Sequence, residues 1–157
     1  MEKLNNLTAI FDHDVLYQMP DYPVVQGKFD TSASCRIVIA HKIVTPLSAV
    51  EADLLEKMML GIKTRLLSNK TMDYSVQINL HTHPHTLAQM VSLYQPTHFL
   101  GFGVTRLDLG LNILAGLYQP IQFLNIWLLF SESLSVLSQA ADKKAKLWEG
   151  MKIAFGQ

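Results

Sequence analysis

One apolar run and the helix pattern after it constrain the fold more than any other part of the chain. Residues 36–44 (RIVIAHKIV) are β-rich and mostly apolar, and residues 48–67 repeat apolar side chains every three or four positions. A strand that is hydrophobic almost throughout is typical of a sheet covered on both faces. A helix with one apolar stripe provides such a cover. The two segments predict a buried central strand followed by a packed helix.

The rest of the chain continues this alternation of strands and helices. The predicted strands are residues 15–17, 74–80, 98–103 and 125–130, and the predicted helices are residues 4–11, 86–94 and two that begin after Ser131 and near Asp142. Such alternation predicts an α/β fold, a three-layer α/β/α sandwich around a central, mostly parallel or mixed sheet of four to five strands.

Length and charge limit the classes of function. The 157 residues match one ordinary domain, so residues 1–157 are predicted to form a single α/β domain. Thirteen basic residues balance thirteen acidic ones. A neutral chain lacks the positive surface of a protein that binds nucleic acid strongly by itself, and its lack of net charge favours association with proteins, including other copies of itself.

The cysteine content and the apolar runs indicate a cytoplasmic protein. Cys35 is the only cysteine, which rules out an internal disulfide, and it precedes an apolar strand as a buried small hydrophobe would. Residues 1–6 lack the apolar core of a signal peptide. The longest apolar runs, such as residues 126–130, are far shorter than the roughly 20 residues that cross a bilayer.

Two helices have apolar stripes that we expect to face the core. In the first, Ser48 and Glu51 fit a capping box. Its stripe is predicted to consist of Val50, Leu54, Met58, Ile62 and Leu66, widened by Leu55, Met59 and Leu67. The stripe of the last helix is predicted to consist of Ala145, Trp148, Met151 and Phe155. We expect Trp148 to clamp this helix to the sheet, and the alternative is an exposed anchor for a partner.

A histidine cluster is the one segment that invites a chemical explanation. His81, His83 and His85 alternate along the chain, and three imidazoles on one face of a strand could bind zinc. Pro84 interrupts strand geometry, however, so we predict a loop without metal. The alternative is a small metal-dependent hydrolase that uses this cluster with Asp108 or His98 as a further ligand. No complete catalytic motif or cofactor-binding motif is present, and we expect no cofactor.

The last thirty residues carry a family pattern. A strand and a short helix containing Ser133 and Leu134 precede the segment 141–155, in which a lysine-flanked Ala145-x-Leu147-Trp148 is followed by Phe155. This arrangement resembles the end of the psi subunit of bacterial DNA polymerase III, most strongly over residues 126–155. The opening, with residues 4–7 followed by an extended piece and a proline, is also similar to the start of psi.

The resemblance implies an adaptor that catalyses nothing. Psi-like proteins have a three-layer α/β fold and link the clamp loader to a further accessory subunit. A protein partner, either the clamp loader or another replication subunit, is therefore expected for this chain. Aromatic residues suit the anchoring of an interface. The candidates for partner binding are Tyr17, Tyr22, Tyr118 and Phe123.

Overall fold

Five strands form one mixed sheet in the computed structural model, which describes residues 34–68 and 70–156. The strands are β1 (Ser34–His41), β2 (Thr71–Asn79), β3 (His98–Phe102), β4 (Ile121–Phe123) and β5 (Ile126–Ser131). Their spatial order is β2-β1-β3-β5-β4, in which β4 pairs antiparallel with β5 and all other pairs are parallel. The predicted α/β class and strand number are confirmed.

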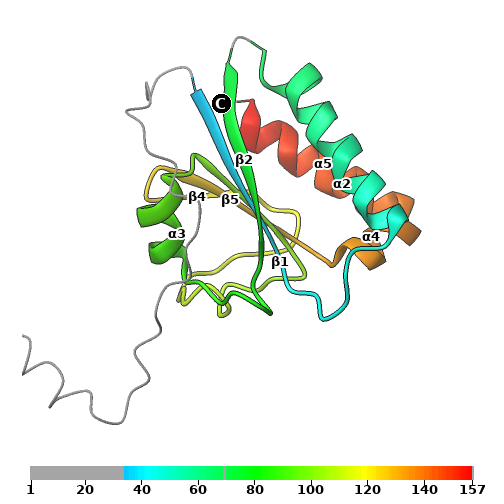
Figure 1. Cartoon of the computed structure of the whole chain (residues 1–157). Helices are drawn as coiled ribbons and strands as arrows, with labels where there is room; N and C mark the ends of the chain where they lie inside the picture. The colour runs from blue at the N-terminus through cyan, green and yellow to red at the C-terminus, as the bar shows by residue number, and fades with distance from the viewer. Residues whose placement is uncertain (1–33, 69, 157) are drawn as a thin grey trace, which may run out of the picture.

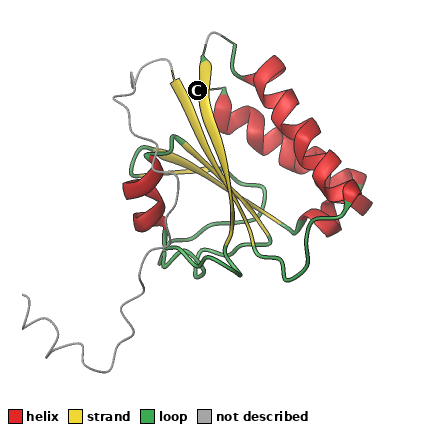
Figure 2. Cartoon of the chain, in the orientation of Figure 1, coloured by secondary structure: helices red, strands yellow, loops and turns green. Residues whose placement is uncertain are grey.

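Helices cover both faces of this sheet. They are α2 (Ala49–Gly61), which continues into the π-helical turn η1 (Ile62–Leu66), α3 (Leu87–Tyr94), α4 (Leu134–Gln139) and α5 (Ala141–Phe155). Figures 1 and 2 show α2, α4 and α5 on one face and α3 on the other. No helix within residues 34–68 and 70–156 is long and apolar enough to cross a membrane. The helix predicted at 4–11 and the strand predicted at 15–17 lie outside the described residues.

The central strand β1 separates two apolar cores. Alternate side chains of a strand point to opposite faces. Ile37 and Ile39 accordingly pack under α2 and α5, whereas Val38 and Ala40 pack on the α3 side. The predicted strand at 36–44 is offset, because Val44 is 80 % exposed and the chain has already left the sheet toward α2.

Each of the two long helices buries part of the apolar stripe predicted for it. In α2, the capping box of Ser48 and Glu51 is confirmed. The fully buried members of its predicted stripe are Leu55, Ile62 and Leu67, and those partly buried against the core are Leu54, Met58, Met59 and Leu66. Val50 is 63 % exposed, so it lies on the opposite side of the helix from the core.

The stripe of α5 is also rotated from its predicted position. Met151 and Phe155 are buried as predicted, but Ala145 is exposed and Leu147 takes the core position instead. Trp148 is half-buried at the margin of the core, so it is neither a full clamp nor a fully exposed anchor. The orientation of each helix differs from the predicted one, and apolar side chains are left between α2 and α5.

The direction of α2 and α5 follows from the strand connections. Because α2 joins the carboxyl end of β1 to the amino end of the parallel strand β2, it runs against the strands. The start of α5 is held near the carboxyl end of β5, where Lys143 Nζ lies 2.8 Å from Glu132 Oε2. Its last residue, Phe155, stacks on His98 at the amino end of β3. The two helices therefore run in the same direction on one face of the sheet.

Candidate functional site: a groove between two helices

A groove of about 400 Å³ lies between α2 and α5. Apolar side chains from both helices line most of it. They are Leu54, Met58, Leu60, Leu147, Trp148 and Met151, together with Gly61 and Thr64. Leu54 and Met58 belong to the predicted core stripe of α2, and their place in the groove follows from the rotation of that helix. Leu60 is 59 % exposed at the rim.

The centre of the groove is the contact between Gly61 and Trp148. A Cβ atom at position 61 would lie 3.0 Å from Cη2 and 3.1 Å from Cζ3 of Trp148. These distances are shorter than ordinary van der Waals contact, so the missing side chain of Gly61 lets the indole approach α2. Sequence reasoning singled out Trp148 but not Gly61 or Leu60. The apolar face of α2 is wider than one contact with the sheet can cover, and this width is the sequence feature that could have indicated a second contact surface.

Three cations and no carboxylate line the groove: Lys57, Arg65 and Lys144. Lys57 Nζ forms an ion pair with Asp53 Oδ2 at 2.7 Å, and the hydrogen bond with Asp53 raises the pKa of Lys57. Arg65 and Lys144 have no ion-pair partner within residues 34–68 and 70–156. Positive charge is thus concentrated here although the chain as a whole is neutral.

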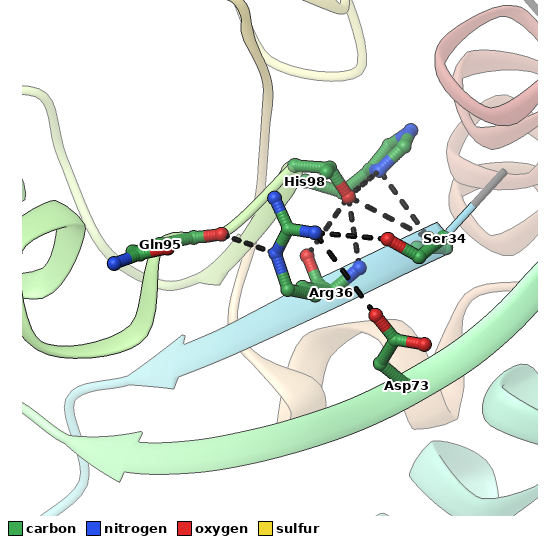
Figure 3. A network of polar contacts seen from close by, with 7 residues as sticks. Ser34, Arg36, Asp73, Gln95 and His98 are labelled. Atoms are coloured by element: carbon green, nitrogen blue, oxygen red, sulfur yellow. Dashed lines mark hydrogen bonds and ion pairs between the residues drawn. The ribbon is translucent and has the colours of Figure 1, made fainter. Parts of the chain in front are cut away.

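Polar side chains at the amino end of the sheet are used to hold the fold together. Figure 3 shows the Arg36 guanidinium between Gln95, Ser34 and Asp73. Its Nε donates to Gln95 O at 2.6 Å, its Nη1 donates to Ser34 Oγ at 2.9 Å, and Nη1 lies 4.0 Å from Asp73 Oδ2. Because these partners belong to β1, β2 and the end of α3, Arg36 joins three elements at this edge.

His98 ties the end of α5 to the sheet in the same region. Its Nε2 donates to the carbonyl oxygen of Ala154 at 2.9 Å, and its ring stacks on Phe155 with centroids 4.1 Å apart. Since a carbonyl can only accept, Nε2 carries the proton and Nδ1 is the acceptor. Nδ1 lies 2.9 Å from Thr97 Oγ1 and 3.4 Å from Cys35 Sγ.

Burial keeps both ionisable groups of this cluster uncharged. It lowers the pKa of His98 to about 4, against a smaller opposing effect of the hydrogen bond to Ala154, and nearby Lys70 lowers it further. Burial also raises the pKa of the Cys35 thiol. A protonated buried thiol is a poor nucleophile, so Cys35 has the structural role that its sequence context predicts.

The carboxyl ends of β1 and β3 are where open α/β sheets usually bind ligands, because the chain leaves these two neighbours in opposite directions. Here Lys42 Nζ forms an ion pair with Asp108 Oδ1 at 2.9 Å. The Asn79 amide exchanges two hydrogen bonds with the backbone of Ile43. His41 Nδ1 is buried without a hydrogen-bond partner in the described part of the chain, and burial lowers the pKa of His41.

The predicted loop at the histidine cluster is confirmed, since residues 80–86 connect β2 to α3 without regular structure. His81 and His83 are exposed, whereas His85 is buried and its Nδ1 lies 2.8 Å from His83 O. The two suggested further ligands lie elsewhere: Asp108 pairs with a lysine, and His98 is at the amino end of β3. Among the described residues, no group of three His, Cys, Asp or Glu side chains could hold a metal ion.

Of the predicted partner-binding aromatics, Tyr118 and Phe123 lie within the described residues, and they pack against different cores. The Tyr118 hydroxyl donates to Glu132 Oε2 at 2.6 Å, and burial followed by this hydrogen bond raises the pKa of Tyr118 to about 12. Phe123 is half-buried against the core on the α3 side. Both side chains make contacts within the fold, and neither lines the groove. Tyr17 and Tyr22 lie outside the described residues.

Comparisons with protein families, with curated proteins and with solved structures give no match to this chain.

Replacing Trp148 tests how much of its side chain serves the stability of the core and how much is available for binding in the groove. We expect Trp148→Ala to lower the free energy of unfolding by about 1–2 kcal/mol, because only part of the indole leaves water on folding. Chemical denaturation measures this loss. A cost above about 3 kcal/mol would show that Trp148 acts mainly as a core clamp, as for a fully buried aromatic side chain.

Proposed function

We propose that this chain is a non-catalytic protein-interaction domain, an adaptor resembling the psi accessory subunit of a replicative DNA polymerase clamp-loader assembly. The groove between α2 and α5 is the observation that carries the proposal. It presents half-buried Trp148 and Met58 and exposed Leu60 between two helices. Tryptophan is enriched among residues that dominate binding energy, and methionine adapts to the shape of a partner.

The residues behind the psi resemblance supply one wall of this groove. Leu147 and Trp148 of the Ala-x-Leu-Trp pattern both line it, and Lys144 lies one turn before Trp148. Leu147 is buried in the core, whereas Trp148 is half-buried at its margin, so Trp148 is the residue of the pattern that supports a role in binding. The replication context rests on the resemblance alone.

The polar clusters outside the groove support the same proposal. Arg36, Asn79 and His98 direct their hydrogen-bonding groups to backbone atoms or to neighbouring side chains of the fold. These contacts stabilise strand edges and helix ends. The three side chains therefore have a structural role, and the proposed binding through the apolar groove does not require them.

A glutamate in place of Leu60 in the groove should weaken binding of the partner protein. We expect tagged full-length protein, incubated in extract of its own host, to retain a specific partner, and Leu60→Glu to reduce that retention at least about tenfold. The variant removes the exposed apolar contact of Leu60 and forces a carboxylate out of water when the partner binds, and this desolvation is costly even beside a cation. Leu114→Glu is the matched control, since Leu114 is 93 % exposed and lies between β3 and β4, outside the groove.

Equal recovery of the partner by wild type and both variants would contradict the use of the groove. Mass spectrometry of the retained protein then decides the context. A clamp-loader or other replication subunit supports the psi-like role. A partner from another process would leave the adaptor function in place and overturn the replication role.

A further inference from the structure

We infer that the groove between α2 and α5 binds an amphipathic α-helix of a partner protein whose polar face is acidic. The inference rests on the proposed function, since it presumes that this groove is the partner surface, and it adds the chemistry of the occupant. An apolar groove between two helices suits a helix whose apolar face lies along it. The charge of the groove then selects among such helices.

The cations are arranged around the apolar centre of the groove. Because α2 and α5 run in the same direction, Lys57 and Lys144 each lie one turn before the contact of Gly61 with Trp148. Arg65 follows Gly61 by one turn. Positive charge therefore flanks the tryptophan at both ends, and Lys57 and Arg65 are about 12 Å apart along the helix axis at 1.5 Å per residue.

Because Asp53 partly neutralises Lys57, most of the positive charge of the groove comes from Arg65 and Lys144. Arg65 is exposed and Lys144 is half-buried, and neither has an ion pair in the described part of the chain. A groove lined by cations with no carboxylate repels a basic helix and attracts an acidic one. Carboxylates two turns apart on one side of a bound helix would face both ends of the groove.

The test uses two synthetic peptides of about 18 residues, long enough to form a helix. Both carry leucine at the same helical spacing, and their polar positions are all glutamate in one and all lysine in the other. Fluorescence anisotropy with the full-length protein measures each affinity. We expect the acidic peptide to bind about tenfold more tightly at about 50 mM salt, and the preference to shrink at high salt because exposed charges are screened.

Charge reversal in the groove locates the effect. In the double variant Arg65→Glu and Lys144→Glu, the lysine peptide should bind more tightly than the glutamate peptide. The matched control is the double variant Lys63→Glu and Lys146→Glu, which changes exposed cations of η1 and α5 that do not line the groove. This control should keep the preference for the acidic peptide, and circular dichroism should show both double variants folded.

The remaining outcomes overturn the inference and separate it from the proposed function. Equal affinity for the two peptides would show that the groove binds helices without regard to charge, which leaves the adaptor function standing. Binding of neither peptide would mean that another occupant fills the groove. Light scattering would identify a second copy as that occupant by a concentration-dependent mass. The proposed function itself stands or falls on the retention experiment with Leu60→Glu.

Discussion

Phe155→Ala is expected to lower the free energy of unfolding by about 3–5 kcal/mol, the usual cost of removing a fully buried aromatic side chain. Phe155 is 2 % exposed, packs in the core under α2 and α5, and stacks on the ring of His98. Its truncation leaves a cavity where the last turn of α5 meets the sheet. Urea denaturation followed by circular dichroism measures the change.

Ile153→Ala provides the control on the same turn of α5. Ile153 is 51 % exposed, so its truncation should change the free energy of unfolding by less than about 1 kcal/mol. Similar losses for the two variants would contradict a specific role of Phe155. A marginally stable domain has roughly 5–15 kcal/mol in total, so Phe155→Ala should also become sensitive to proteolysis at its carboxyl end.

Acidification is expected to remove on the order of 3 kcal/mol of stability through His98 alone. The pKa of His98 is about 4 in the fold and 6.5 as the reference value. Between these values the unfolded chain binds a proton that the fold excludes, so stability is complete above about pH 6.5 and is lost as the pH falls toward 4. The magnitude follows from about 1.4 kcal/mol for each pH unit of that interval.

Two measurements isolate this contribution. The pH dependence of the free energy of unfolding should flatten between about pH 6.5 and 4 in His98→Gln relative to the wild type. His41 acts in the same direction, since burial lowers its pKa too, and it remains in His98→Gln. NMR titration of the His98 ring in the wild type gives its pKa directly. A value near 6.5 would refute the prediction even if His98→Gln failed to fold.

These two effects act at the same junction, and that junction positions the proposed binding surface. His98 and Phe155 hold the last turn of α5 against the amino end of β3. Lys143 and Glu132 hold its first turn near the carboxyl end of β5. With both ends attached, α5 is held with Trp148 against Gly61. Contacts that hold a binding surface in place reduce the conformational entropy lost when a partner binds.

The pattern of the sequence determined the kinds of element and most of their places. The apolar run of β1, the capping box of α2 and the buried run at His98–Phe102 were all predictable, because periodicity and capping are local properties. The short strand β4 was not predicted. Its three residues carry too little pattern to be distinguished from a loop, and it exists because it pairs with β5.

Tertiary structure alone decided which side of each long helix faces the core. The apolar face of α2 is wide enough to allow several rotations, and the sequence pattern favoured the one centred on Leu54 and Met58. Packing against the sheet buried Leu55 and Ile62 of this wide face fully and left Leu54 and Met58 partly buried, where they also line the groove. Contacts between residues far apart in the chain, such as Gly61 with Trp148 or His98 with Phe155, depend on how the helices cross the sheet. The local sequence pattern identifies the apolar side chains of each helix. Only the packing of all the elements together decides which of these apolar side chains are buried and which remain exposed to solvent.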